Sequence, residues 1–307
     1  MKIKVTTTKF LGLLLFLLAA AFFIGKAIFS KSQQFSQMSL IHESDLSKIT
    51  NVVIKNKNDS IEIFNIADVW FAKKNGQVFP CSHLKIVSFF SKLAQPRVYS
   101  LYSKDSSSLD RYSLDENSCF QLILKNGEKL HSKIDLGSKD FSHSFVFYTT
   151  ASDPFIYKMF YDFENFITTD AAFWNDPSLF FENPFGRQTL SKIVATLDSK
   201  GITVQAGSLD KDGNDVFQKI KTLRHGTLFS KASDMTISGD FIRAGAKPEL
   251  FVRAFYGSDS MDIAFLKISD DYYLISYSAM DGAFSCSFTL SRWSYLQLRT
   301  VLLSVTS

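Results

Sequence analysis

The sequence predicts an α+β protein in which an N-terminal transmembrane helix is followed by two similar strand-rich repeats, each with an antiparallel sheet and one or two packed helices. Three observations support this prediction. Residues 10–29 are apolar almost throughout, the chain after residue 45 is dominated by alternating apolar and polar positions, and the order of predicted elements recurs after residue 186. We therefore expect a membrane-bound end and a larger folded part.

The apolar segment at 10–29 (FLGLLLFLLAAAFFIGKAIF) carries Lys26 as its only charge. About twenty helical residues at 1.5 Å each span the roughly 30 Å hydrocarbon core of a bilayer. A cleaved secretory signal is the alternative, because basic residues precede the apolar run. Large side chains stand where a signal peptidase requires small ones, so the sequence favours an uncleaved anchor.

Basic residues on the two sides of this segment predict its orientation. Lys2, Lys4 and Lys9 precede it, whereas Lys26 and Lys31 lie at and beyond its end. The positive-inside rule keeps the amino terminus in the cytoplasm and exports the rest. We expect a single-pass protein of the bacterial inner (cytoplasmic) membrane, with the bulk of the chain extracytoplasmic.

The first repeat begins with strands. Residues 49–55 and 60–66 alternate in polarity, and Asn75-Gly76 is a two-residue hairpin signal. Ser82 is a suitable N-cap for a helix that ends before Pro96. The apolar face expected for this helix consists of Leu84, Val87, Phe90 (or Phe89) and Leu93. The further strands expected are 97–102, 119–124, 130–136, 144–149 and 155–160, followed by a short helix at 162–168.

Two prolines and two asparagines make residues 173–186 a turn-rich linker. Beyond it we expect two strands, a helix capped by Asn214 or Asp215, four more strands and a closing helix at 292–305. Single letters recur with the order of elements: Gly127 matches Gly257, and Phe163 matches Trp293. An internal duplication is therefore expected. The expected domains are a cytoplasmic N-terminus (1–9), the anchor (10–29), a stalk (30–44), a first α+β repeat (45–172), the linker (173–186) and a second α+β repeat (187–307).

Composition excludes some classes of partner. The net charge is +4 over 307 residues, and Lys and Arg are spread along the chain, so no nucleic acid is expected as a partner. Cys81, Cys119 and Cys286 are an odd number of thiols, so at least one is free, and a Cys81–Cys119 disulfide stays open.

Motifs for catalysis and metal binding are absent from the sequence. There is no GxSxG nucleophile elbow and no GxxxxGK[ST] or GxGxxG phosphate loop. The acidic run from Asp210 to Asp215 lacks the Gly and Glu that an EF-hand requires at its sixth and twelfth positions. Five histidines lie singly and are expected in surface or loop positions: His42, His83, His131, His143 and His225. We expect no enzyme activity, no catalytic residue, no cofactor and no metal.

Aromatic side chains are the remaining candidates for a functional surface, because the chain has 31 Phe, 11 Tyr and 3 Trp. Trp70, Trp174, Phe180 and Phe181 could form an interaction surface on which another molecule docks. Packing in the core or the linker is the alternative for each of them.

Several short segments resemble one family. They are Ser44-Asp45-Leu46-Ser47-Lys48-Ile49, Val69-Trp70-Phe71 with Pro80 before a helix, Asp110-Arg111-Tyr112-Ser113-Leu114, and Ile134-Asp135-Leu136-Gly137. Together with the N-terminal apolar helix, this layout resembles the bacterial domain-of-unknown-function 4340 family. Members of that family are typically encoded beside gliding-motility-type ABC transporter subunits, and the family has no established catalytic residues. The resemblance implies the membrane and ABC-type transporter subunits as partners.

These observations predict a membrane-anchored extracytoplasmic binding or scaffold protein, a non-catalytic accessory of an ABC-type transport or gliding-motility-like complex. Two alternatives stay open. One is an envelope glycan- or lipid-binding module that uses aromatic side chains. The other is a hydrolase whose catalytic residues lie far apart in the sequence.

Overall fold

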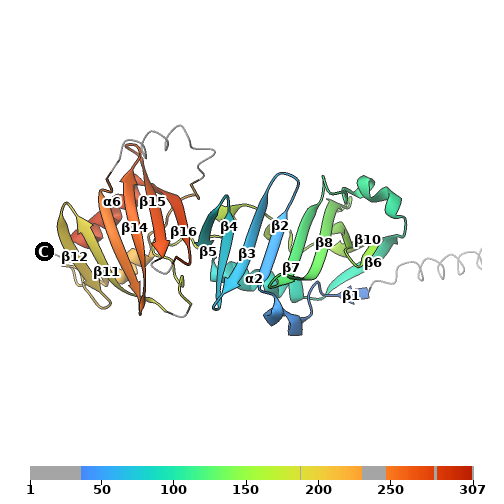
Figure 1. Ribbon diagram of the computed structural model, residues 1–307, viewed down its shortest axis with the longest axis horizontal. Coiled ribbons are helices and arrows are strands. Elements are labelled where there is room, and N and C mark those ends of the chain that lie inside the picture. Colours follow the sequence, from blue (N-terminus) through green and yellow to red (C-terminus); the bar gives the residue numbers. More distant parts are fainter. Residues whose placement is uncertain (1–35, 187, 230–246, 280–281, 306–307) are drawn as a thin grey trace, which may run out of the picture.

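The computed structural model describes residues 36–186, 188–229, 247–279 and 282–305. Their strands form one 16-stranded sheet in which every pair of neighbours is antiparallel, and a few helices pack on it, which confirms an α+β fold built mainly on antiparallel sheet. The strands follow one another along the length of an elongated molecule (Figure 1). The order across the sheet is β1-β6-β10-β9-β8-β7-β2-β3-β4-β5-β16-β15-β14-β13-β11-β12.

The first half of the sheet holds ten strands and the helix α2 (His83–Ala94). A 3-10 helix, η1 (Glu43–Lys48), precedes β2, and a second one, η2 (Ser106–Tyr112), follows β6. The strands are β1 (Ser36–Met38), β2 (Asn51–Lys55), β3 (Ser60–Ile66), β4 (Val69–Lys74), β5 (Gln77–Pro80), β6 (Arg97–Ser103), β7 (Phe120–Asn126), β8 (Lys129–Lys139), β9 (Phe145–Thr150) and β10 (Asp153–Phe160).

The second half holds six strands with α4 (Val216–Lys221) and α6 (Arg292–Leu303), and it is reached through η3 (Glu164–Phe166) and α3 (Ala171–Trp174). The carboxylate of Asp215 caps α4, as expected, by accepting hydrogen bonds from the backbone N–H groups of Phe217 and Gln218. The strands are β11 (Leu190–Leu197), β12 (Lys200–Gln205), β13 (Leu250–Tyr256), β14 (Asp259–Lys267), β15 (Tyr272–Ala279) and β16 (Ser285–Ser291).

Tight turns join most neighbouring strands and set their register. Asn75 and Gly76 both have positive φ angles (50° and 77°) and connect β4 to β5, as the Asn-Gly signal predicts. Gly127 (φ 57°) turns β7 into β8, and Gly257 (φ 59°) turns β13 into β14. Glycine has no Cβ and therefore adopts a positive φ angle at a lower steric cost than other residues, which explains why glycine stands at these turns.

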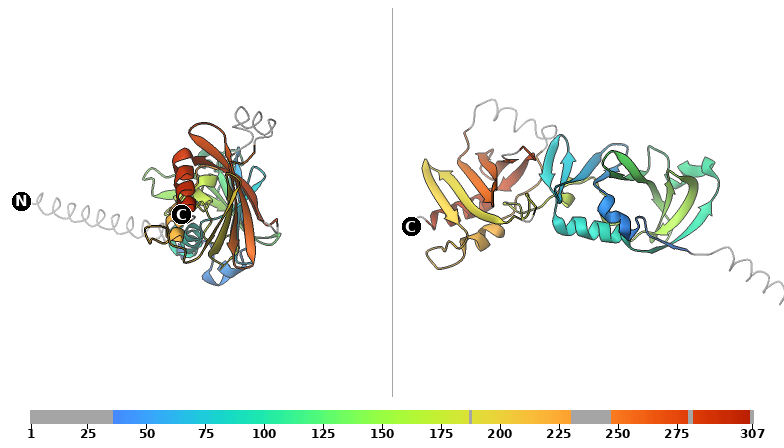
Figure 2. Two further views of the ribbon diagram at one scale, coloured as in Figure 1. Left: turned by 90° about the vertical axis from the view of Figure 1, so that its left-hand side faces the viewer. Right: turned by 60° about the horizontal axis from the view of Figure 1, so that its bottom comes forward.

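One face of the sheet carries the core. Inward-pointing residues of both halves, such as Ile63 and Ile263, share one hydrophobic cluster with Phe89 of α2, Ile220 of α4 and Leu298 of α6. Figure 2 shows these helices on the same side of the sheet. The opposite face is more polar because strand side chains alternate between the two faces.

The apolar face predicted for the first helix is wrong for two of its members. Ile86, Phe89 and Leu93 are the buried residues of α2, whereas Leu84 is 76% and Val87 52% exposed. Apolar side chains occupy two sides of this helix, and the sequence pattern does not show which side meets the sheet.

The short helix expected at 162–168 is a 3-10 turn at Glu164–Phe166, with α3 a few residues later. The letter match between Phe163 and Trp293 does not extend to packing, since Phe163 is fully buried and Trp293 is 68% exposed.

All three cysteines are free, so the structure contains no Cys81–Cys119 disulfide. Among the described residues, no helix is both long and apolar enough to cross a membrane, and the anchor expected at 10–29 lies outside them.

The two halves of the sheet meet along a narrow seam. Val78 of β5 pairs with Ser285 of β16, and that is the one residue pair between these two strands. Beside it, the Gln77 side-chain amide accepts a hydrogen bond from the Ser287 N–H (2.7 Å) and donates one to the Phe229 carbonyl. The Phe229 N–H in turn donates to the Ser287 carbonyl (2.8 Å). The amide of Gln77 thus takes the place of a peptide group in the ladder that joins the halves.

Replacing Gln77 by Ala is expected to lower the free energy of unfolding by about 1–3 kcal/mol, because a backbone donor and a backbone acceptor lose their partner. Urea denaturation of the purified protein measures this loss. Gln205→Ala is the matched control, since Gln205 lies exposed on β12, at the edge of the sheet. Equal losses in the two variants would show that the amide does not join the halves.

Candidate functional site

A groove beside α2, here called the α2 groove, is a hollow on the helix side of the sheet. Its volume is about 960 Å³, and its walls are η1, α2 and the turn between β3 and β4. Figure 2 (right) shows η1 next to α2. The lining residues are Glu43, Leu46, Ser47, Ile49, Thr50, Asn65, Asp68, Trp70, His83, Ile86, Val87, Phe90, Ser91, Ala94, Gln95 and Pro96.

The floor of the α2 groove is apolar. The rings of Trp70 and Phe90 lie 5.0 Å apart between centroids, and both side chains are half-buried. Ile86 lies beneath them in the core, and Val87 projects from the next position of α2. Two side chains of the apolar face predicted for this helix, Val87 and Phe90 (for which Phe89 was the alternative), therefore line this groove, and Phe90 also packs against the core.

The rim of the α2 groove is acidic. Glu43 and Asp68 are exposed on it, and none of the described residues that line it is Lys or Arg. The lysines of α2 bind elsewhere: Lys85 donates to the Phe173 carbonyl, and Lys92 forms an ion pair with Asp162 (2.8 Å). The residues that line the groove therefore include no Lys or Arg, although the whole chain carries a net charge of +4; His83 is the one imidazole among them.

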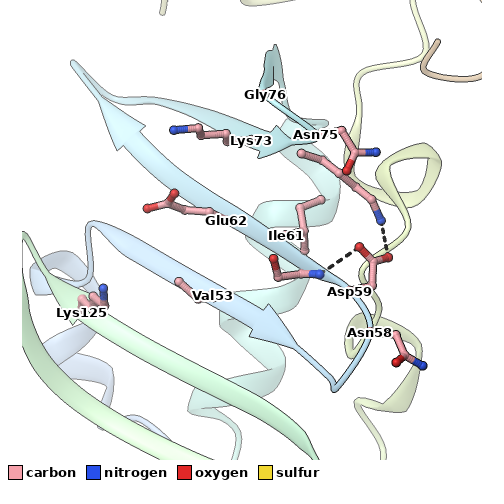
Figure 3. A pocket seen from close by; sticks show the side chains of 11 residues that line it. Val53, Asn58, Asp59, Ile61, Glu62, Lys73, Asn75, Gly76 and Lys125 are labelled. Carbon is pink, nitrogen blue, oxygen red and sulfur yellow. Dashed lines mark hydrogen bonds and ion pairs between the residues drawn. The ribbon is translucent and has the colours of Figure 1, made fainter. Parts of the chain in front are cut away.

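A second hollow lies around the β2–β3 and β4–β5 turns and is polar (Figure 3). Its volume is about 520 Å³. Asp59 already has partners there, because Lys74 forms an ion pair with it (2.5 Å) and Thr169 Oγ1 donates to the same carboxylate (2.8 Å). Glu62 likewise accepts a hydrogen bond from the Asn51 amide (2.6 Å). Because the carboxylates of Asp59 and Glu62 already have partners and the lining is mostly polar, this hollow is a weaker candidate than the α2 groove.

The structure separates the four aromatic residues proposed as an interaction surface. Trp70 lines the α2 groove. Trp174, Phe180 and Phe181 are buried in the core, so in this structure they form no surface and fit the packing alternative. The indole N–H of Trp174 donates to the Thr168 carbonyl (2.9 Å), which satisfies the one polar atom of that side chain. Residues 173–186 thus include core-packing side chains as well as turns.

His225 lies in a loop, as the sequence suggested, but this part of the loop is buried and not at the surface. Its Nε2 lies 2.7 Å from the Asp176 carbonyl and its Nδ1 3.0 Å from the Gly226 carbonyl. The imidazole packs against the Phe288 ring with centroids 3.9 Å apart. Burial lowers the pKa of His225, against the two carbonyl contacts, which raise it. No motif surrounds this histidine in the sequence, so nothing there indicated its burial.

The acidic run at 210–215 is a turn that satisfies its own oxygens. The Asp210 carboxylate accepts hydrogen bonds from Lys219 and from the backbone N–H groups of Asp212 (2.9 Å) and Asn214 (2.8 Å). The Lys219 contact in particular holds the pKa of Asp210 well below its usual range. Within the described ranges, no group of three or more His, Cys, Asp or Glu side chains is arranged to hold a metal ion.

Comparison with known proteins identified no relative: no family model, no curated protein and no solved structure matches this chain.

Stability is expected to fall as the pH drops below about 6.5, because the unfolded chain then binds a proton that buried His225 binds less readily. Two charged groups lie close to His225. Burial raises the pKa of Asp176, and the Arg224 charge lowers that of His225. Urea denaturation at pH 7.5, 6.5 and 5.5 (about one unit apart) measures the trend.

In His225→Gln the decline between these pH values is expected to be smaller, since the titrating group is gone. The exposed His131→Gln variant serves as the control and should keep the wild-type decline. A decline unchanged in His225→Gln would assign the pH dependence to other groups.

Proposed function

We propose that this chain is a membrane-anchored extracytoplasmic binding protein whose α2 groove holds a segment of another protein. The observation that carries the proposal is the apolar floor of this groove, with Trp70 and Phe90 half-buried and Val87 exposed. Exposed apolar area costs about 25 cal/mol per Å², and a partner that covers it recovers this free energy. Tryptophan in a concave site is also a frequent binding hot spot.

The place of the groove along the chain supports this proposal. The anchor expected at 10–29 ends only a few residues before β1, which begins at Ser36, and η1 follows from Glu43. Six extended residues reach at most about 20 Å. The start of β1 would therefore lie within about 20 Å of the membrane. The groove wall formed by η1 begins seven residues after Ser36, so the groove could meet the exposed part of a membrane-bound partner.

ABC-type transporter subunits are the partner class that the family resemblance implies, so the accessory role in an ABC-type transport or gliding-motility-like complex is part of this proposal. The alternatives of a glycan- or lipid-binding module and of a hydrolase receive no specific support from the α2 groove. Its rim offers two carboxylates and one imidazole around an apolar floor.

We further propose that the two halves arose by duplication of one α+β unit. Strand order supports this idea: β10-β9-β8-β7-β2-β3 in the first half has the same chain path as β16-β15-β14-β13-β11-β12 in the second. In each half a helix, α2 or α4, follows the paired strands β2–β3 or β11–β12. The bridge between Leu228 and Phe288 corresponds to the pairing of β6 with β10. On this interpretation, β4 and β5 are additions that fill the seam.

The anchor is tested by fractionation of cells that make the full chain. The protein is expected in the membrane pellet after alkaline carbonate extraction, because a spanning helix resists this treatment whereas peripheral contacts do not. Deletion of residues 10–29 should move it to the soluble fraction. Full-length protein released by carbonate, or a mature chain that lacks these residues, would contradict the proposed anchor.

The binding role is tested with a photoreactive phenylalanine analogue placed at single positions of α2 in the full chain, in the membranes of its native host. Val87 lines the α2 groove, whereas Leu84 and Ser88 are exposed positions of the same helix that do not line it. Cross-links to transporter subunits are expected from position 87 and not from the two control positions. Equal yields from all three positions would exclude the groove as the binding site.

A further inference from the structure

We infer that the α2 groove selects an amphipathic helix whose apolar side is bordered by Lys or Arg. This inference rests on the proposed function and specifies the chemistry of the partner segment. Three features of the groove lead to it: the pairing of its strands, its length along α2 and the charge of its rim.

Strand pairing excludes one common mode of peptide binding. A peptide that adds a strand to a sheet needs a strand with a free backbone edge. The strands beside the α2 groove are interior ones, because β3 pairs with both β2 and β4, and β4 pairs with both β3 and β5. A partner must therefore bind here through side chains, which is how helices bind in grooves.

The length of the groove suits a helix of a few turns. Lining residues run along the whole of α2 from His83 to Ala94, a stretch of about 17 Å at 1.5 Å per residue. They recur at helical spacing, with His83, Val87, Phe90 and Ala94 on one side of α2. A second helix lying along this side would place its own apolar residues, three or four positions apart, over Val87 and Phe90.

The charge of the rim defines the polar side of the partner. Glu43 and Asp68 are exposed at the rim, and the α2 lysines that could balance them are bound to Phe173 and Asp162. Basic side chains beside the apolar stripe of a partner helix would meet these negative groups. An anionic lipid surface, by contrast, would be repelled by them.

The probes are two labelled 14-residue peptides (about four helical turns). Both have Leu at the same amphipathic spacing, and all remaining positions are Lys in one peptide and Glu in the other. The full chain, in zwitterionic nanodiscs and with the photoreactive analogue at position 87, is irradiated with each peptide. Position 88 is the matched control for non-specific capture. The Lys peptide is expected to cross-link at 87 and the Glu peptide not to do so.

Charge reversal at the rim provides the second measurement. Glu43→Lys with Asp68→Lys should weaken cross-linking of the Lys peptide by about tenfold and strengthen that of the Glu peptide, because both carboxylates are replaced by like charges. Both residues are exposed, so the fold is expected to be retained, which circular dichroism verifies.

Three results would overturn the inference. Equal capture of the two peptides at position 87 would refute charge selection and leave a helix-binding groove. No capture of either peptide above the control at 88, with cross-links to native membrane proteins still present at 87, would show that the occupant is not such a helix while the proposed function stands. Loss of both kinds of cross-link at 87 would refute the inference and the proposed function together.

Discussion

Burial of one face of a continuous sheet is the constraint on which the rest of this structure depends. Each half of the sheet supplies a row of apolar residues to that face, and α2, α4 and α6 cover them in a single hydrophobic cluster. The halves can share this cluster only if their strands keep the same side inward across the seam. The pairing of Val78 with Ser285, and the Gln77 amide beside it, keep the two ladders in phase. A slip of one residue there would turn every side chain of one half to the wrong face.

Much of the sheet could be predicted from the sequence because its signals are local. Alternation of polarity marks β2 and β3, the Asn75-Gly76 turn marks the β4–β5 hairpin, and Asp215 marks the start of α4. Each of these signals is contained within a few residues, and its physical cause is the backbone conformation or the hydrogen bond of those same residues. They specify elements and neighbours along the chain.

Features that depend on contacts distant in the sequence could not be predicted. His225 is buried by contacts with Asp176 and Phe288, which lie far from it along the chain. The sequence around a single histidine does not indicate such contacts. Trp174 and Phe181 lie in a segment whose prolines indicate turns, yet the fold places them in the core. The candidate site was anticipated at Trp70 alone, since the α2 groove exists only where η1 and the β3–β4 turn come together beside α2.

The side chains of α2 show how the core and the candidate site compete for the same apolar residues. A helix that packs on a sheet buries only the side that faces the sheet. Apolar residues on its other sides remain in contact with water unless another element covers them. In α2, Ile86, Phe89 and Leu93 are buried in the core, and Val87 and Phe90 remain accessible at the groove. The sequence pattern mixed these two sets because both repeat at helical spacing. An amphipathic helix with more apolar residues than its own sheet can bury has a second apolar side, and in this chain that side coincides with an acidic rim and a half-buried tryptophan.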